Sequence, residues 1–118
     1  MQEVRKILAD FQSGFGQMRQ NDAAFASQFE GMVDMVYKDG ALSRKQKELI
    51  SVAIGAYNRC KYCIVVHVYG ALEAGATREE IIEAAKVAIA GFGSGPSMAY
   101  STTYLFDALN EFEKDFKK

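Results

Sequence analysis

The sequence predicts an all-α fold, a six-helix bundle in a single domain that spans residues 1–118. Apolar residues recur at helical spacing along almost the whole chain, and no stretch alternates between apolar and polar residues for long enough to form a strand. Of the 118 residues, 49% are apolar, which is enough for one hydrophobic core but leaves little room for two domains.

Two apolar stripes predict the first two helices. Residues 4–15 carry apolar side chains three and four positions apart, and we expect Gly14 and Gly16 to fray the end of this helix. A second stripe runs over residues 25–36 and follows a polar cap at residues 21–22. Each stripe gives its helix one apolar face.

The third helix is predicted to begin at a capping box formed by Ser43 and Gln46 and to run to about Tyr57. Residues 49–56 are apolar or small on every side, so we expect this helix to be buried at the centre of the bundle. After a short turn, a fourth helix covers residues 60–75.

A second capping box, Thr77 with Glu80, opens a fifth helix, which ends in the glycine-rich residues 91–95. Pro96 suits the first turn of a sixth helix, whose apolar side chains continue to Phe116. Because so short a chain cannot cover all these apolar faces, we expect a homo-oligomer with the C-terminal helix in its interface.

Composition excludes several classes of function. The 14 basic and 15 acidic residues form no long run of one sign, so we expect neither nucleic-acid binding nor membrane binding through a basic patch. The uncharged residues 87–106 are interrupted by glycines and a proline, which argues against a membrane span. Without a signal-peptide pattern or a disulfide-rich composition, the chain is expected to be cytoplasmic.

Both cysteines and the only histidine lie within eight consecutive residues, Cys60-Lys-Tyr-Cys63-Ile-Val-Val-His67. At 100° per residue, these three side chains occupy one narrow strip of the fourth helix. The amide groups at a helix N-terminus stabilise a thiolate, and a Cys-X-X-Cys pair at that end can close to a disulfide and reopen. This pattern favours thiol chemistry.

Glu48 is the fourth candidate, because it is an acid at the edge of the apolar third helix. If the third and fourth helices form an antiparallel hairpin, Glu48 returns alongside the fourth helix near His67. Gly55 would let the two helices approach closely. A buried carboxylate in this place would accept a proton from a thiol or orient the imidazole.

Other interpretations of these residues remain open. The cysteines could be structural, His67 a satisfied core histidine and Glu48 a solvated acid. A zinc site built from Cys60, Cys63, His67 and Glu48 is chemically possible, although zinc ligand pairs usually come from turns. Four tyrosines are expected to be core or interface aromatics: Tyr57, Tyr62, Tyr100 and Tyr104.

The spacing of the four candidate residues resembles a known signature. Glu48, eleven residues, Cys60-X-X-Cys63, three residues and His67 resemble the AhpD-like alkylhydroperoxidases of the carboxymuconolactone decarboxylase family. The resemblance extends from about Phe25 into the C-terminal helix. It implies a helical fold assembled as trimers or hexamers, and a thiol peroxidase or disulfide reductase activity that needs no metal and no cofactor.

The resemblance also implies a role for each site residue. Cys63 would attack a hydroperoxide and pass through a sulfenic acid, and Cys60 would resolve it to a disulfide. Glu48 and His67 would relay protons, and a lipoylated protein or a thioredoxin-like carrier would reduce the disulfide. Tyr62 stands where many members have a histidine, so the proton relay has one base fewer than in those members.

Two alternative functions remain beside the peroxidase. One is a carboxymuconolactone decarboxylase-like lyase that uses the same pocket, although that branch of the family generally lacks the cysteine pair. The other is a non-catalytic redox module, whose disulfide forms without turning over peroxide. Loss of the thiols would abolish peroxidase activity and would spare a lyase.

Overall fold

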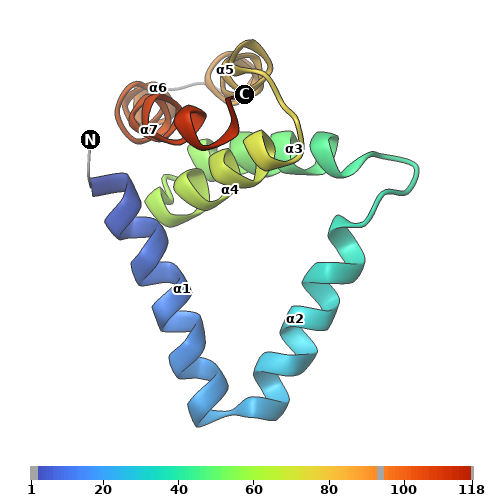
Figure 1. The fold of residues 1–118 in the computed structure, drawn as a ribbon. Helices are drawn as coiled ribbons and strands as arrows, with labels where there is room; N and C mark the ends of the chain where they lie inside the picture. Colours follow the sequence, from blue (N-terminus) through green and yellow to red (C-terminus); the bar gives the residue numbers. More distant parts are fainter. Residues whose placement is uncertain (1–2, 93–94, 118) are drawn as a thin grey trace.

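The structure is a computed structural model that describes residues 3–92 and 95–117, and within these residues it is all-helical (Figure 1). Two short π-helical segments continue neighbouring α-helices, so that the described residues form six helical rods, as predicted. The elements are α1 (Glu3–Asn21), α2 (Ala23–Tyr37), α3 (Arg44–Tyr57), α4 (Lys61–Glu73), α5 (Arg78–Lys86), η1 (Val87–Gly91), α6 (Gly95–Tyr100), η2 (Ser101–Leu105) and α7 (Phe106–Phe116). Part of the break expected at residues 91–95, residues 93–94, lies outside the described residues.

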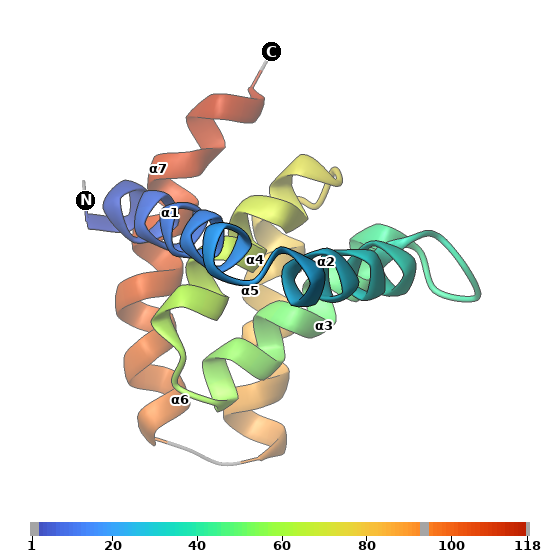
Figure 2. The same cartoon turned by 90° about the horizontal axis from the view of Figure 1, so that it is seen from below.

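Helices α3 and α4 form the centre of the molecule. The α1–α2 hairpin opens as a V on one side of this pair, and α5, α6 and α7 lie on the other side (Figures 1 and 2). Gly55 of α3 faces Cys63 of α4, whereas Glu48 of α3 faces His67. The two helices are therefore antiparallel, as the sequence analysis assumed.

The hydrophobic core surrounds α4 and gathers side chains from five of the α-helices. Phe112 of α7 is fully buried, and its ring meets that of Tyr69 edge-on at 5.1 Å between centroids. Burial of each such side chain contributes about 1.5–3 kcal/mol. The largest apolar side chains in the core are Val4, Val52, Ile64, Val65, Val68, Ile81, Leu105, Leu109 and Phe112.

The helix caps agree with the sequence. The side chain of Asp22, within the predicted cap, accepts a hydrogen bond of 3.1 Å from the backbone N–H of Phe25. Both predicted capping boxes are present, at the starts of α3 and α5. Gly75, with a φ of 95°, lies just beyond the end of α4, where glycine adopts the left-handed region without strain.

Two expectations about the helices were wrong. Helix α1 continues without a break past Gly14 and Gly16, because its second half packs on α2 through the Phe15 and Phe29 rings, 5.7 Å apart. Helix α3 is not buried on every side, since Ile50 and Ile54 are 46% and 59% exposed. Only one side of α3 packs on α4, and this chain leaves the opposite side open.

The four tyrosines divide into two groups. Tyr100 and Tyr104 pack against the core, as expected. Tyr57 and Tyr62 are exposed, which contradicts a core position for them. Within residues 3–92 and 95–117, no helix combines the length and the apolar character needed to cross a bilayer.

Much exposed apolar surface belongs to the two helices of the V. The chain exposes 7305 Å², whereas a compact protein of 13.1 kDa exposes about 6,400 Å². The exposed large side chains of α1 and α2 are Phe11, Met18, Phe25, Phe29, Met32, Met35 and Val36. An apolar surface of this extent on a single chain is typical of proteins that associate.

Candidate functional site

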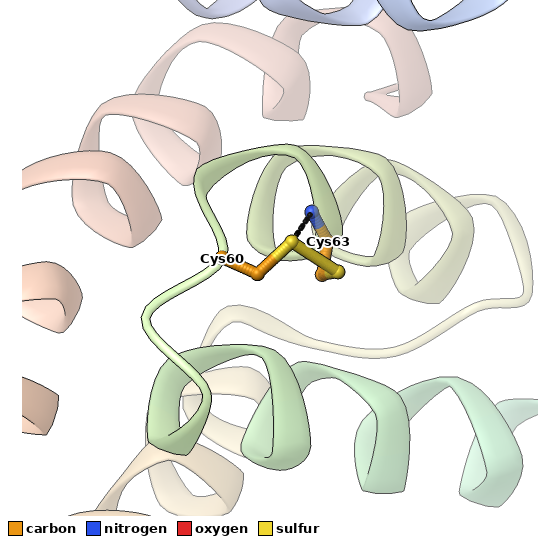
Figure 3. Close-up of a disulfide and its surroundings, with 2 residues drawn as sticks. All are labelled: Cys60 and Cys63. Carbon is orange, nitrogen blue, oxygen red and sulfur yellow. Dashed lines mark hydrogen bonds between the residues drawn. A yellow bond between two sulfur atoms is a disulfide. The ribbon is translucent and has the colours of Figure 1, made fainter.

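The two cysteines stand at the N-terminus of α4. Cys60 is the N-cap residue, and its Sγ accepts a hydrogen bond of 3.1 Å from the backbone N–H of Cys63 (Figure 3). The two sulfurs form a disulfide across a Cα–Cα distance of 5.2 Å. Both residues are half-buried, and the sulfurs lie on the side of α4 that is turned toward α3.

A tight turn between α3 and α4 places Cys60 at the cap. Arg59 adopts a φ of 54°, which is the left-handed region that L-residues rarely occupy. The backbone N–H of Cys60 donates to the carbonyl of Gly55 at 3.1 Å, which closes the end of α3. The turn thus reverses the chain and points the Cys60 side chain at the first amides of α4.

Gly55 brings the two helices together at the disulfide, as predicted. A Cβ added at Gly55 would lie 3.1 Å from the Cβ of Cys63 and 3.2 Å from the backbone nitrogen of Ile64. These distances are shorter than ordinary van der Waals contact. Glycine is therefore the residue that allows α4 to approach α3 this closely.

Glu48 and His67 form a second pair on the same two helices. The Oε1 atom of Glu48 lies 2.8 Å from Nδ1 of His67, and Glu48 is only 7% exposed. An ionised carboxylate can only accept, so Nδ1 carries the proton and donates it. In the neutral ring, Nε2 is then left as a free base.

Neighbouring residues hold this pair in place. The ring of Tyr37, at the end of α2, stacks on His67 with centroids 5.7 Å apart, and its hydroxyl is hydrogen-bonded to Ser51. The guanidinium of Arg44 lies 4.0 Å from Oε2 of Glu48. The buried carboxylate therefore has a partner at each oxygen, as buried charges require.

Sequence reasoning missed Tyr37, Arg44 and Gly70, which all adjoin the Glu48–His67 pair. Gly70 lies on α4 beside the Glu48 carboxylate. One signal was available, since Gly70 follows His67 by three residues and thus shares its side of the helix. Tyr37 belongs to a distant segment, and no spacing in the chain points to it.

The four candidate residues form two adjacent pairs. The described contacts of His67 are with Glu48 and Tyr37, and the sulfurs contribute none of them. Cys63 precedes His67 by one helical turn. In the part of the chain that the structure describes, no three His, Cys, Asp or Glu side chains gather as metal ligands.

A large open cavity of about 1210 Å³ lies between the α1–α2 hairpin and the α3–α4 pair. Glu48 and His67 belong to the α3–α4 wall, while Phe15, Phe29 and Tyr37 line the hairpin side. The opening of the V is visible in Figure 1. The Glu48–His67 pair is therefore reachable from this cavity.

A sequence model of the carboxymuconolactone decarboxylase family matches residues 23–102, a range that contains all four candidate residues. An uncharacterized protein of Cupriavidus necator is 34% identical over 110 residues, which are 92% of this chain and 96% of that protein. The alkyl hydroperoxide reductase AhpD of Mycobacteroides abscessus is 31% identical over 78 residues, 66% of this chain but only 45% of that enzyme.

Solved structures share the fold. A carboxymuconolactone decarboxylase family protein of Legionella pneumophila, solved in its apo form, has a TM-score of 0.89 at 31% identity, covering 96% of this chain and 99% of that one. A family protein of Thermotoga maritima, for which an involvement in the antioxidative response has been suggested, has a TM-score of 0.73 at 27% identity. It covers 92% of this chain and 93% of that one.

Proposed function

The chain belongs to the carboxymuconolactone decarboxylase family, and from this premise we propose that it is a thiol-dependent peroxidase that reduces a hydroperoxide with Cys60 and Cys63. The observation that carries the proposal is the Cys-X-X-Cys pair at the start of α4, followed one turn later by His67, which is hydrogen-bonded to the buried Glu48 of α3. Similarity to AhpD supports the same chemistry.

In the first step, the thiolate of Cys63 attacks the hydroperoxide. A bond forms between sulfur and the terminal oxygen while the O–O bond breaks, which leaves a sulfenic acid on Cys63 and an alkoxide. His67 takes the thiol proton at Nε2 through one water and returns it to the alkoxide, which leaves as an alcohol. Glu48 keeps the imidazole in the required tautomer and stabilises its protonated form.

In the second step, Cys60 resolves the sulfenic acid. Its sulfur attacks the sulfur of Cys63, the disulfide forms, and the hydroxyl leaves as water. The backbone N–H of Cys63 donates to the sulfur of Cys60, which stabilises a thiolate at this position. Arg59 and Lys61 flank Cys60 in the sequence, and positive charge next to a cysteine favours its thiolate.

In the third step, an external dithiol reduces the Cys60–Cys63 disulfide and becomes a disulfide itself. The sum of the three steps is hydroperoxide plus dithiol giving alcohol, water and oxidised carrier. A lipoylated protein or a thioredoxin-like carrier has the required chemistry. The reducing cytoplasm, where such carriers are kept reduced, is the compartment that we expect.

We further propose that the active form is a homo-oligomer, a trimer or a hexamer. The exposed apolar side chains of α1 and α2 support this, as do Ile50 and Ile54 on the open side of α3. A second copy of the chain exposes the same apolar faces, which could pack against those of the first. Association would cover surface that a single chain of this size leaves in water.

A peroxide-consumption assay tests the proposed peroxidase, with a lipoylated carrier and thioredoxin as alternative reductants. Cys63→Ser and Cys60→Ser should each abolish turnover, while circular dichroism shows that both variants keep the helical fold. Turnover of peroxide by Cys63→Ser would refute the assignment. Lyase activity that survives loss of both thiols would support a decarboxylase, and a disulfide that forms without turnover would indicate a redox module.

A further inference from the structure

We propose that Gly70 is a positioning residue of this site: its missing side chain leaves the space that the Glu48 carboxylate occupies while it holds His67. The inference rests on the proposed function, in which His67 moves the proton. Gly70 touches neither the cysteines nor, in the proposed mechanism, the substrate. It would act only through Glu48.

The distances leave no room for a larger residue. A Cβ added at Gly70 would lie 2.7 Å from both Cδ and Oε1 of Glu48 and 2.8 Å from Oε2. Distances under 3.0 Å force a shift, and the carboxylate would reach ordinary contact at 3.4 Å by retreating 3.4 − 2.7 = 0.7 Å. Oε1 is the atom that accepts the hydrogen bond from His67 at 2.8 Å.

The Glu48 carboxylate can move when a methyl group is added at position 70. It is the far end of a flexible side chain, so it gives way more easily than the backbone of either helix. The guanidinium of Arg44, 4.0 Å from Oε2, would attract it away from His67. Alanine at position 70 is therefore expected to leave the fold intact and to break the hydrogen bond between Glu48 and His67.

Helix stability gives no reason for a glycine here. Gly70 lies inside α4, where alanine is the better helix former. Gly31, inside α2, has no atom within 4 Å of an added Cβ and is therefore a matched control for the same substitution. Gly70→Ala and Gly31→Ala change the helix propensity equally but differ in what the new methyl group meets.

The first readout is NMR of the imidazole in the whole protein. Because His67 is the only histidine, its hydrogen-bonded Nδ1–H proton can be assigned without ambiguity. We expect this signal in the wild type and in Gly31→Ala and expect it to be lost in Gly70→Ala. A retained signal, or an unfolded Gly70→Ala chain, would overturn the inference.

The second readout is the rate of peroxide consumption. Gly70→Ala should lower kcat/KM by about a hundredfold, since a displacement of about 1 Å at a reacting site has an effect of that order. In the Glu48→Ala background the same change should have no further effect, because Gly70 acts only through Glu48. An equal loss in both backgrounds would overturn the inference. If the wild type consumes no peroxide, the proposed function fails, and the NMR comparison still decides the role of Gly70.

Discussion

Replacing Glu48 by glutamine isolates the contribution of the buried charge, because the two side chains have nearly the same shape. In the wild type, Nδ1 of His67 donates to Glu48 at 2.8 Å. Glutamine can still accept this hydrogen bond, but as a neutral partner. Hydrogen bonds to charged groups contribute about 1.5–3 kcal/mol, against about 0.5–1.5 kcal/mol for neutral ones. The imidazolium formed during proton transfer would therefore lose about 1–1.5 kcal/mol of stabilisation.

That difference corresponds to a five- to twelvefold lower kcat/KM, at about 1.4 kcal/mol for each factor of ten. The assay is initial-rate peroxide consumption with a saturating dithiol reductant. Glu73→Gln is the matched control, because Glu73 pairs with Arg44 at 3.1 Å but has no contact with His67. Wild-type rates for Glu48→Gln, or an equal loss in Glu73→Gln, would refute the role given to the Glu48 carboxylate.

Three further predictions concern the fold and the assembly. Arg59→Gly should raise the free energy of unfolding by about 1 kcal/mol, because glycine relieves the left-handed backbone, whereas Arg59→Ala should not; urea titration checks both. The hydrogen bond from Arg5 lowers the pKa of Glu111 below its ordinary value of 4.5. The pair therefore stabilises the fold at a pH above 4.5, and this stabilisation is lost as the pH falls from 4.5 through the lowered pKa. Glu111→Gln should accordingly flatten the acid decline of Tm. Ile54→Lys should reduce the mass seen by analytical ultracentrifugation without unfolding the chain, since Ile54 is 59% exposed.

Local patterns predicted the helices well because each is specified by a few neighbouring residues. Both capping boxes depend on side chains within one turn of the backbone they bond. The contact between Glu48 and His67 followed from the antiparallel α3–α4 hairpin, because the short turn leaves few ways to pair the two helices. The helices that carry the site and the pairing of Glu48 with His67 could thus be predicted from the sequence.

What the sequence did not reveal depends on distant partners. Tyr37 reaches His67 from α2, whose direction is set by tertiary packing rather than by any spacing in the chain. The role that we propose for Gly70 can be recognised only once the position of the Glu48 carboxylate is known. The open side of α3 was expected to be buried, because the apolar character of a helix indicates that it is covered but not which molecule covers it.

Trapping of the sulfenic acid tests the central claim, that Cys63 is the thiol that attacks peroxide. Reduced Cys60→Ser protein is treated with one equivalent of hydroperoxide in the presence of dimedone, and the modified residue is identified by peptide mass spectrometry. The account predicts a dimedone adduct on Cys63, and none on Cys60 when Cys63→Ser is treated in the same way. An adduct on Cys60 in Cys63→Ser, or no adduct on Cys63 in Cys60→Ser, would contradict it.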